Sequence, residues 1–193
     1  MFNELFHPMI VKSFSDDDHP AYGQAATVDE KGHPQVRTVH FRYLEDQDKI
    51  SFAANIKSSK WSQIAKSHRI AGCYFDSHRL IQFRWEGDAR LVDRKDENEG
   101  DIVQKMWGLV RPDVRSAYWL DSKKISLTKK PWPEMDVDSC CPNFGIVICT
   151  PKVWDIMEVN PDDYRLDRRT VHQWNGKQWE SKQVSVLHGK ELY

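Results

Sequence analysis

The feature that most constrains this chain is a series of strand-length segments joined by short turns between residues 21 and 92. Residues 21–44 read as strand, turn and strand, with Asp29-Glu30-Lys31-Gly32 as the turn, and a third strand is predicted at 49–54. Two more strands are expected at 70–76 and 80–92, and Gly87 marks a bulge or bend in the second. No βαβ rhythm is present, so the pattern predicts an antiparallel barrel or sandwich in the α+β class, mainly β.

Helices are predicted to decorate this sheet at a few points. Residues 58–68 place Trp61, Ile64, Ala65 and His68 on one face at helical spacing, with Ser58 as a plausible cap. Further helices are expected at 96–107 and from Arg111-Pro112-Asp113 onward, followed by strands at 144–149 and 153–159 and a hairpin at Asn175-Gly176. We expect one domain over 1–193, with 1–20 as a poorly patterned lead-in containing at most one short helix and 123–143 as a loop or lid.

Length and composition exclude several classes of protein. The 193 residues suffice for one core, with 39% hydrophobic and 30% charged residues and a net charge of -1. This balance indicates neither a nucleic-acid-binding protein nor a disordered one, and the longest apolar runs are too short to span a bilayer. The N-terminus lacks the pattern of a signal peptide, and the spacing of Cys73, Cys140, Cys141 and Cys149 fits neither a disulfide framework nor a zinc site. We therefore expect a cytoplasmic protein with reduced thiols and no metal, and the pattern leaves open whether Cys140 and Cys141 have a role.

Two weak signals in residues 37–60 together indicate a phosphate site. Alternation places Arg37 with Val39 and Phe41 on one face of a strand, and Arg42 on the opposite face. Ser58-Ser59-Lys60 then begins a helix, and helix N-termini bind phosphate through free N–H groups and the positive end of the dipole. Taken alone, a solvated strand end and an ordinary serine cap would explain these residues.

The order of three motifs resembles the pyridoxamine 5'-phosphate oxidase family of FMN-binding split β-barrels. The motifs are "RTVHFR", "FAANIKSSK" and "HRLIQFRWEGDARLV", and a late "YRLDRR" resembles the Arg-Leu-His-Asp-Arg ending of that family. The resemblance is strongest over residues 20–115 and weaker over 144–186. It implies an antiparallel split barrel, FMN as cofactor, and a homodimer with FMN at the subunit interface.

The resemblance also implies roles for individual residues. The FMN-binding residues that it implies are Arg37, Thr38, Val39, Arg42, Ser58, Ser59, Lys60, Gln82 and Arg169. Arg37 and Lys60 would hold the phosphate, Val39 would contact the flavin through its backbone, and Gln82 would come from the partner subunit. The implied substrate-binding residues are Arg42, Trp107, Arg111 and Arg165. The register of "RLDRR" leaves open whether Arg168 or Arg169 is the functional arginine.

Departures from the family pattern leave two functions open. Ala53-Ala54 replaces an aromatic residue and a threonine, Ser59 replaces an arginine, and Asp167 stands at the position of a histidine. A carboxylate beside a phosphorylated substrate would repel it.

The first hypothesis is an FMN-dependent oxidoreductase that takes a hydride from an amine or alcohol, with pyridoxamine or pyridoxine 5'-phosphate as candidate substrates and oxygen as acceptor. The alternative is an FMN-binding carrier, sensor or reductase without vitamin B6 oxidase activity; a split barrel for heme or a deazaflavin is a third reading. No protein nucleophile or acid–base pair is predicted to be catalytic.

Overall fold

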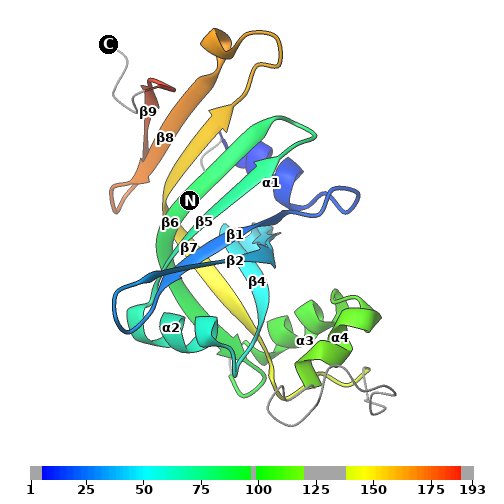
Figure 1. Ribbon diagram of the computed structural model, residues 1–193. Coiled ribbons are helices and arrows are strands. Elements are labelled where there is room, and N and C mark those ends of the chain that lie inside the picture. The colour runs from blue at the N-terminus through cyan, green and yellow to red at the C-terminus, as the bar shows by residue number, and fades with distance from the viewer. Residues whose placement is uncertain (1–5, 97–98, 120–137, 188–193) are drawn as a thin grey trace.

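The computed structural model describes residues 6–96, 99–119 and 138–187, and its centre is one antiparallel sheet of nine strands. The strands are β1 (Tyr22–Val28), β2 (Pro34–His40), β3 (Arg42–Leu44), β4 (Lys49–Asn55), β5 (Arg69–Asp76), β6 (Ile81–Asp93), β7 (Phe144–Glu158), β8 (Arg168–Trp174) and β9 (Trp179–Val184). Their order is β2-β1-β5-β6-β7-β4-β3, with β8 and β9 continuing from β7. The strongly curved sheet in Figure 1 confirms the predicted antiparallel, mainly β architecture.

The interior of the barrel is filled by aromatic side chains and closed by the N-terminal helix α1 (His7–Phe14). Ile10 and Phe14 lie one helical turn apart and are both buried, as is Phe6 just before the helix. The ring of Phe14 lies 5.3 Å from Phe83 and 5.7 Å from Trp85, measured between centroids. The predicted lead-in over 1–20 therefore contains a helix that supplies part of the core.

Strands β6 and β7 are long, and their pairing is irregular where Gly87 lies opposite Pro151. The register shifts between Glu86 and Gly87, which confirms an irregularity at the predicted glycine, but the extra residue of the bulge is Lys152 on β7. A Cβ atom on Gly87 would lie 2.1 Å from the carbonyl oxygen of Thr150, so the close approach requires glycine. The predicted strands at 144–149 and 153–159 are one continuous strand, because Pro151 adjoins the bulge at Lys152, where proline is tolerated without ending the pairing.

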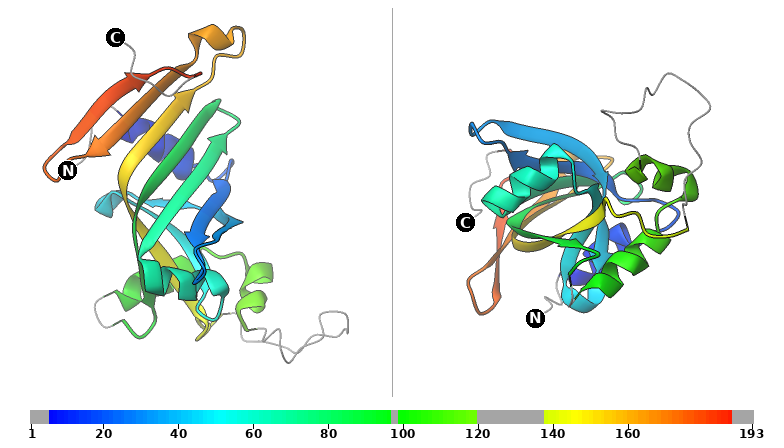
Figure 2. Two further views of the ribbon diagram at one scale, coloured as in Figure 1. Left: turned by 60° about the vertical axis from the view of Figure 1, so that its left-hand side comes forward. Right: turned by 90° about the horizontal axis from the view of Figure 1, so that it is seen from below.

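Three further helices gather at one end of the barrel. They are α2 (Ser59–Ser67), α3 (Gly100–Gly108) and α4 (Pro112–Trp119), and short 3-10 turns cover Glu45–Gln47 and Tyr164–Leu166. Figures 1 and 2 show α2 on one side of this end and α3 with α4 on the other. Helix α3 packs on the outer face of β6 and β7 and forms a second core in which Trp107 contacts Phe144.

The hairpin of β8 and β9 extends the sheet at the end away from these helices (Figure 1). Gly176 has a φ of 97°, and Trp174 pairs with Trp179 across the hairpin, as predicted from the Asn175-Gly176 turn. No helix within the described ranges is long and apolar enough to span a membrane. Of the loop predicted over 123–143, residues 123–137 lie outside the described residues.

Candidate functional site

Arg37 on β2 is fixed by neutral hydrogen-bond acceptors from β1 and α2. Its Nη1 donates to the carbonyl oxygen of Ala25 at 3.2 Å and to Thr27 Oγ1 at 2.7 Å, and its Nη2 donates to Gln63 Oε1 at 3.1 Å. Burial lowers the pKa of the guanidinium group from its ordinary value. Within the described residues, no carboxylate forms an ion pair with Arg37. The side chain is therefore a partly buried cation that the fold orients without neutralising.

Lys60, in the first turn of α2, lies beside Arg37. Burial, and then the charge of Arg37, lower the pKa of the Lys60 ammonium group. Ser58 precedes the helix as its N-cap, but its side chain makes no capping hydrogen bond, which differs from the role predicted for it. The Ser58 Oγ atom is buried and has no hydrogen-bond partner among the residues that the structure describes.

These groups fit a phosphate ester in charge and in chemistry. Two cations lie side by side at the start of a nine-residue helix, whose first N–H groups have no partners within the helix. A buried hydroxyl without a partner is unfavourable, and an anionic oxygen beside Ser58 would satisfy it. Arg37 and Lys60 thus lie near each other, and Ser58 is the N-cap of the helix that carries Lys60. Ser59, the first residue of α2, is exposed. The sequence did not single out Thr27 and Gln63, which orient Arg37; only their pairing across β1 and α2 identifies them.

A cavity of about 620 Å³ opens between β2, β3, β4, the loop at 15–20 and the α3–α4 segment. Its lining includes His40, Arg42, Ala53 and Arg111. The guanidinium group of Arg42 donates to the carbonyl oxygen of Leu109 at 3.3 Å and has no carboxylate partner among the described residues. The strand that carries Ala53 ends at Asn55, shortly before α2 begins at Ser59. Its volume is typical of a small-molecule site.

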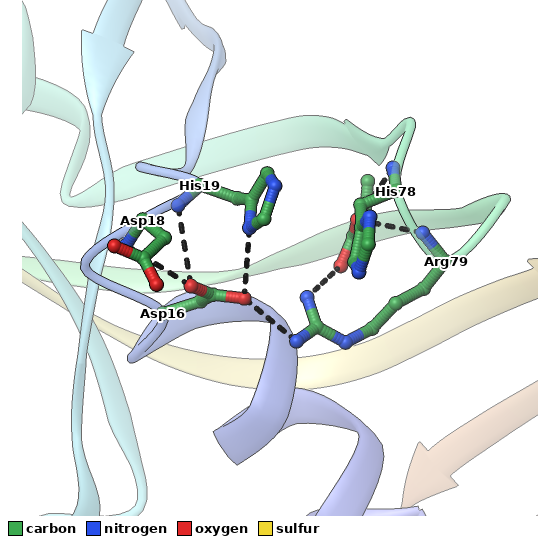
Figure 3. Close-up of polar contacts among 6 residues, drawn as sticks. Asp16, Asp18, His19, His78 and Arg79 are labelled. Carbon is green, nitrogen blue, oxygen red and sulfur yellow. Dashed lines mark hydrogen bonds and ion pairs between the residues drawn. The ribbon is translucent and has the colours of Figure 1, made fainter.

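The loop at 15–20 forms one wall of this cavity and is anchored to the turn between β5 and β6. Figure 3 shows Asp16 accepting hydrogen bonds from its own loop and from Arg79, at 2.6 Å to the guanidinium group. Arg79 also pairs with the buried Asp76, and the rings of His19 and His78 stack 4.3 Å apart. The hydrogen bond from Arg79 is the main reason why the pKa of Asp16 falls to about 2. This anchor holds the loop at the edge of the cavity.

On the outward face of the sheet, two predicted cofactor residues share one row. Gln82 on β6 pairs with Met157 on β7, which pairs with Arg169 on β8. Arg169 donates to both oxygens of the buried Asp155 at 2.9 and 2.8 Å, and Arg84 pairs with the same carboxylate. Strand alternation places Arg168 on the opposite face from Gln82, so Arg169 is the arginine that shares a surface with it. Asp155 was not singled out from the sequence.

Comparison with known proteins identifies a similar family. Residues 2–93 match the family described as pyridoxamine 5'-phosphate oxidase, FMN-binding domain. The match covers a little less than half of the chain. The matched family binds FMN, which is the cofactor predicted from the sequence motifs.

A curated relative and two solved structures extend the comparison. The pyridoxine/pyridoxamine 5'-phosphate oxidase 2 of Arabidopsis thaliana is 27% identical over 96 residues, which is 49% of this chain and 48% of the relative. This chain therefore aligns with about half the length of that oxidase. A pyridoxamine 5'-phosphate oxidase-related, FMN binding protein from Nostoc punctiforme has a TM-score of 0.80 at 23% identity, covering 96% of this chain and 100% of that one. PhzG from Burkholderia lata has a TM-score of 0.66 at 16% identity, covering 86% and 82%. These two similarities establish the split-barrel fold.

The residues that the family resemblance assigned to the substrate are not gathered in one place. Trp107 is 1% exposed and packs in the core beneath α3, so its ring does not line the cavity. Arg111 lines the cavity but pairs with Asp113, and Arg165 is exposed and pairs with Asp163. Arg42 is the predicted substrate residue that faces the cavity without a carboxylate partner among the described residues.

The remaining predicted cofactor residues lie along β2. Thr38 is exposed on the outward face, and the side chain of Val39 is buried in the core, which leaves its backbone for ligand contacts. The four cysteines are free thiols, and no group of three or more metal-ligating side chains forms within the described ranges. The candidate site of this chain therefore consists of the cationic corner around Arg37 and Lys60, a cavity and an outward sheet face.

Proposed function

We propose that this protein is an FMN-dependent oxidoreductase and that Arg37, Ser58 and Lys60 hold the FMN phosphate. The observation that carries the proposal is the buried Ser58 Oγ, without a partner among the described residues, at the N-cap of the helix whose first turn carries Lys60 near Arg37. A dianionic phosphate would accept from all three groups and would remove the repulsion between the cations. Bound FMN would supply the acceptance of a hydride and the transfer of electrons to oxygen or another acceptor.

The proposed active form is a cytoplasmic homodimer in which Gln82 and Arg169 of each subunit complete the site of the other. In support, the outward sheet face exposes apolar side chains that a soluble protein normally covers. Val36 is 62% exposed, Val28 47% and Phe75 46%. A groove of about 500 Å³, lined by Ala26, Ala71 and their neighbours, runs across the same face. Burial of this face against a second copy would bring the row that contains Gln82 and Arg169 to the interface.

Within the cavity, this chain's own residues would select and orient the substrate. Arg42 offers a guanidinium group to an anionic substituent, and the anchored loop at 15–20 shields one side from water. The proposed substrate is an amine or alcohol of small size. Pyridoxamine and pyridoxine 5'-phosphate are the first candidates, in view of the name of the Arabidopsis relative.

A second candidate function is that of an FMN-binding protein without vitamin B6 oxidase activity. The burial of Trp107 and the pairing of Arg111 with Asp113 favour it, because both residues would otherwise serve a substrate phosphate. Asp167, at the position of the family histidine, accepts a hydrogen bond from the backbone of Asn160 at 2.7 Å and so stabilises its own loop.

The first test is a visible absorption spectrum of the purified protein, followed by addition of pyridoxamine 5'-phosphate under air with detection of peroxide. Flavin bands with release of peroxide would establish a vitamin B6 oxidase. Flavin bands without turnover would retain the cofactor and favour the second candidate. Absence of flavin, together with no uptake of added FMN, would overturn both functions.

A further inference from the structure

His40 occupies a position in the cavity that none of the proposed roles uses. It is the last residue of β2, and its side chain projects outward, on the same face of the sheet as Tyr22, its cross-strand partner. The two rings lie 4.8 Å apart at an angle of 30°, so Tyr22 fixes the plane of the imidazole. Neither ring nitrogen of His40 has a hydrogen-bond partner in the part of the chain that the structure describes. A half-buried imidazole thus faces the cavity with its polar atoms available.

Several of the elements that line the cavity place ionisable groups around His40. The ionisable groups there are Asp16, Asp17, Tyr22, Arg42, Arg111 and Tyr118. Burial, and then the charge of Arg42, lower the pKa of His40 to about 4, and Asp17 acts in the opposite direction. His40 is therefore neutral near pH 7, and Arg42 is the fixed positive charge beside it.

We propose that His40 and Arg42 form a proton-linked anion site, in which His40 takes up a proton when an anionic ligand binds beside Arg42. Arg42 provides the permanent charge, because its guanidinium group has one carbonyl acceptor and no carboxylate among the described residues. An anion at this position would offset the charge of Arg42 that opposes protonation of His40. The proton would come from solvent, and the resulting imidazolium would donate a hydrogen bond to the anion.

Proton uptake makes the affinity for the anion depend on pH in a defined direction. Binding favours the protonated imidazole, so the affinity rises as the pH falls toward the value at which free His40 titrates, about 4. If the bound anion raises the titration midpoint of His40 by about two pH units, the affinity for the anion is about tenfold higher at pH 5 than at pH 7.5. The proposal concerns the substrate side of the proposed function, but the anion site itself does not require FMN.

The test is a titration of the FMN-loaded protein with sulfate, followed by the NMR signals of the histidine rings from pH 3.5 to 8. Sulfate keeps its charge over this range, and bound FMN occupies the other anion site. The His40 signal is assigned by its loss in His40→Gln. We expect saturating sulfate to move the His40 midpoint upward by at least one pH unit. An unchanged midpoint, or no binding of sulfate, would overturn the proposal.

Two charge variants give opposite expected results. Arg42→Gln removes the fixed charge, so the midpoint of free His40 rises and sulfate affinity falls about tenfold or more. Asp17→Asn removes a negative charge, so the titration midpoint of free His40 falls. Sulfate then binds more tightly at pH 7.5. His33→Gln, in the exposed turn after β1, serves as the matched control and leaves both quantities unchanged. If the protein takes up no FMN, the proposed function fails, and the same titration of the apoprotein still decides the role of His40.

Discussion

Lys60 lies close enough to Arg37 for the charge of the guanidinium group to lower the pKa of the ammonium group, in addition to the larger effect of burial. Hydrogen bonds to Thr27 and Gln63 hold Arg37 in this position. Within the described residues, neither cation has a carboxylate partner. Two adjacent like charges held by the fold destabilise the empty site, and a bound dianion would reverse this effect.

Lys60→Gln is expected to weaken FMN binding about tenfold to a hundredfold, because it removes one charge-assisted hydrogen bond to the phosphate. Binding of riboflavin, which has no phosphate, should change less than about twofold. Quenching of flavin fluorescence measures both affinities. Lys66→Gln is the matched control, since Lys66 lies on the same helix but pairs with Glu30 on the surface. Equal losses for FMN and riboflavin would contradict the assignment of Lys60 to the phosphate.

Asp155→Asn is expected to lower the free energy of unfolding by about 2 kcal/mol, because it leaves two neighbouring guanidinium groups without their shared carboxylate. Asp155 is 7% exposed and pairs with both Arg84 and Arg169. Urea unfolding at pH 7 measures the change. Arg84→Gln should lower the free energy of unfolding by less than about 1 kcal/mol, because Arg84 is half exposed and the bidentate pair with Arg169 remains. A larger loss for Arg84→Gln than for Asp155→Asn would refute this account.

His172 is expected to make the protein less stable in acid. Its ring is 5% exposed, its Nδ1 lies 2.7 Å from Ser181 Oγ, and Phe6 packs 4.2 Å from it between centroids. Burial lowers its pKa from 6.5 to about 4, so the unfolded chain binds a proton that the folded chain does not. The stability from neutral His172 is present above pH 6.5 and is lost as the pH falls toward 4.

The measurement is urea unfolding of the wild type and of His172→Gln at pH 7 and pH 5. From pH 7 to pH 5, the free energy of unfolding of the wild type should fall by about 2 kcal/mol more than that of the variant, because glutamine does not titrate. The pKa of His40 is lowered in both proteins, so the contribution of His40 to the pH dependence cancels in the comparison. Parallel pH dependence of the two proteins would show that His172 does not titrate on unfolding.

Val36→Glu is expected to convert the proposed dimer to monomer without unfolding it. Val36 is 62% exposed, so glutamate remains solvated in a monomer, whereas burial of its charge between two copies is strongly unfavourable. Sedimentation velocity measures the oligomeric state, and FMN affinity should fall together with dimerisation. Val114→Glu, on the 42% exposed Val114 of α4, is the control and should remain dimeric. A wild-type protein that sediments as a monomer would contradict the proposed interface.

The sequence by itself determined the features that depend on neighbouring residues. Alternation along residues 21–54 specified antiparallel strands, Gly87 specified the bulge, and Asn175-Gly176 specified the last hairpin. These features follow from local backbone preferences, so a short window of sequence contains the information. Pro151 misled the prediction of β7, because its effect depends on how β7 pairs with Gly87, which is far away in the chain.

Only the tertiary structure decided how the candidate site is assembled. Thr27, Arg37 and Gln63 meet because β1, β2 and α2 pack together, and no local pattern links them. The missing cap hydrogen bond of Ser58 and the cavity around His40 likewise depend on the packing of distant segments. Hydrogen bonds, burial and charge act over a few ångströms in space regardless of separation along the chain. The motifs therefore predict which residues would hold a phosphate, and the fold determined which side chains orient Arg37.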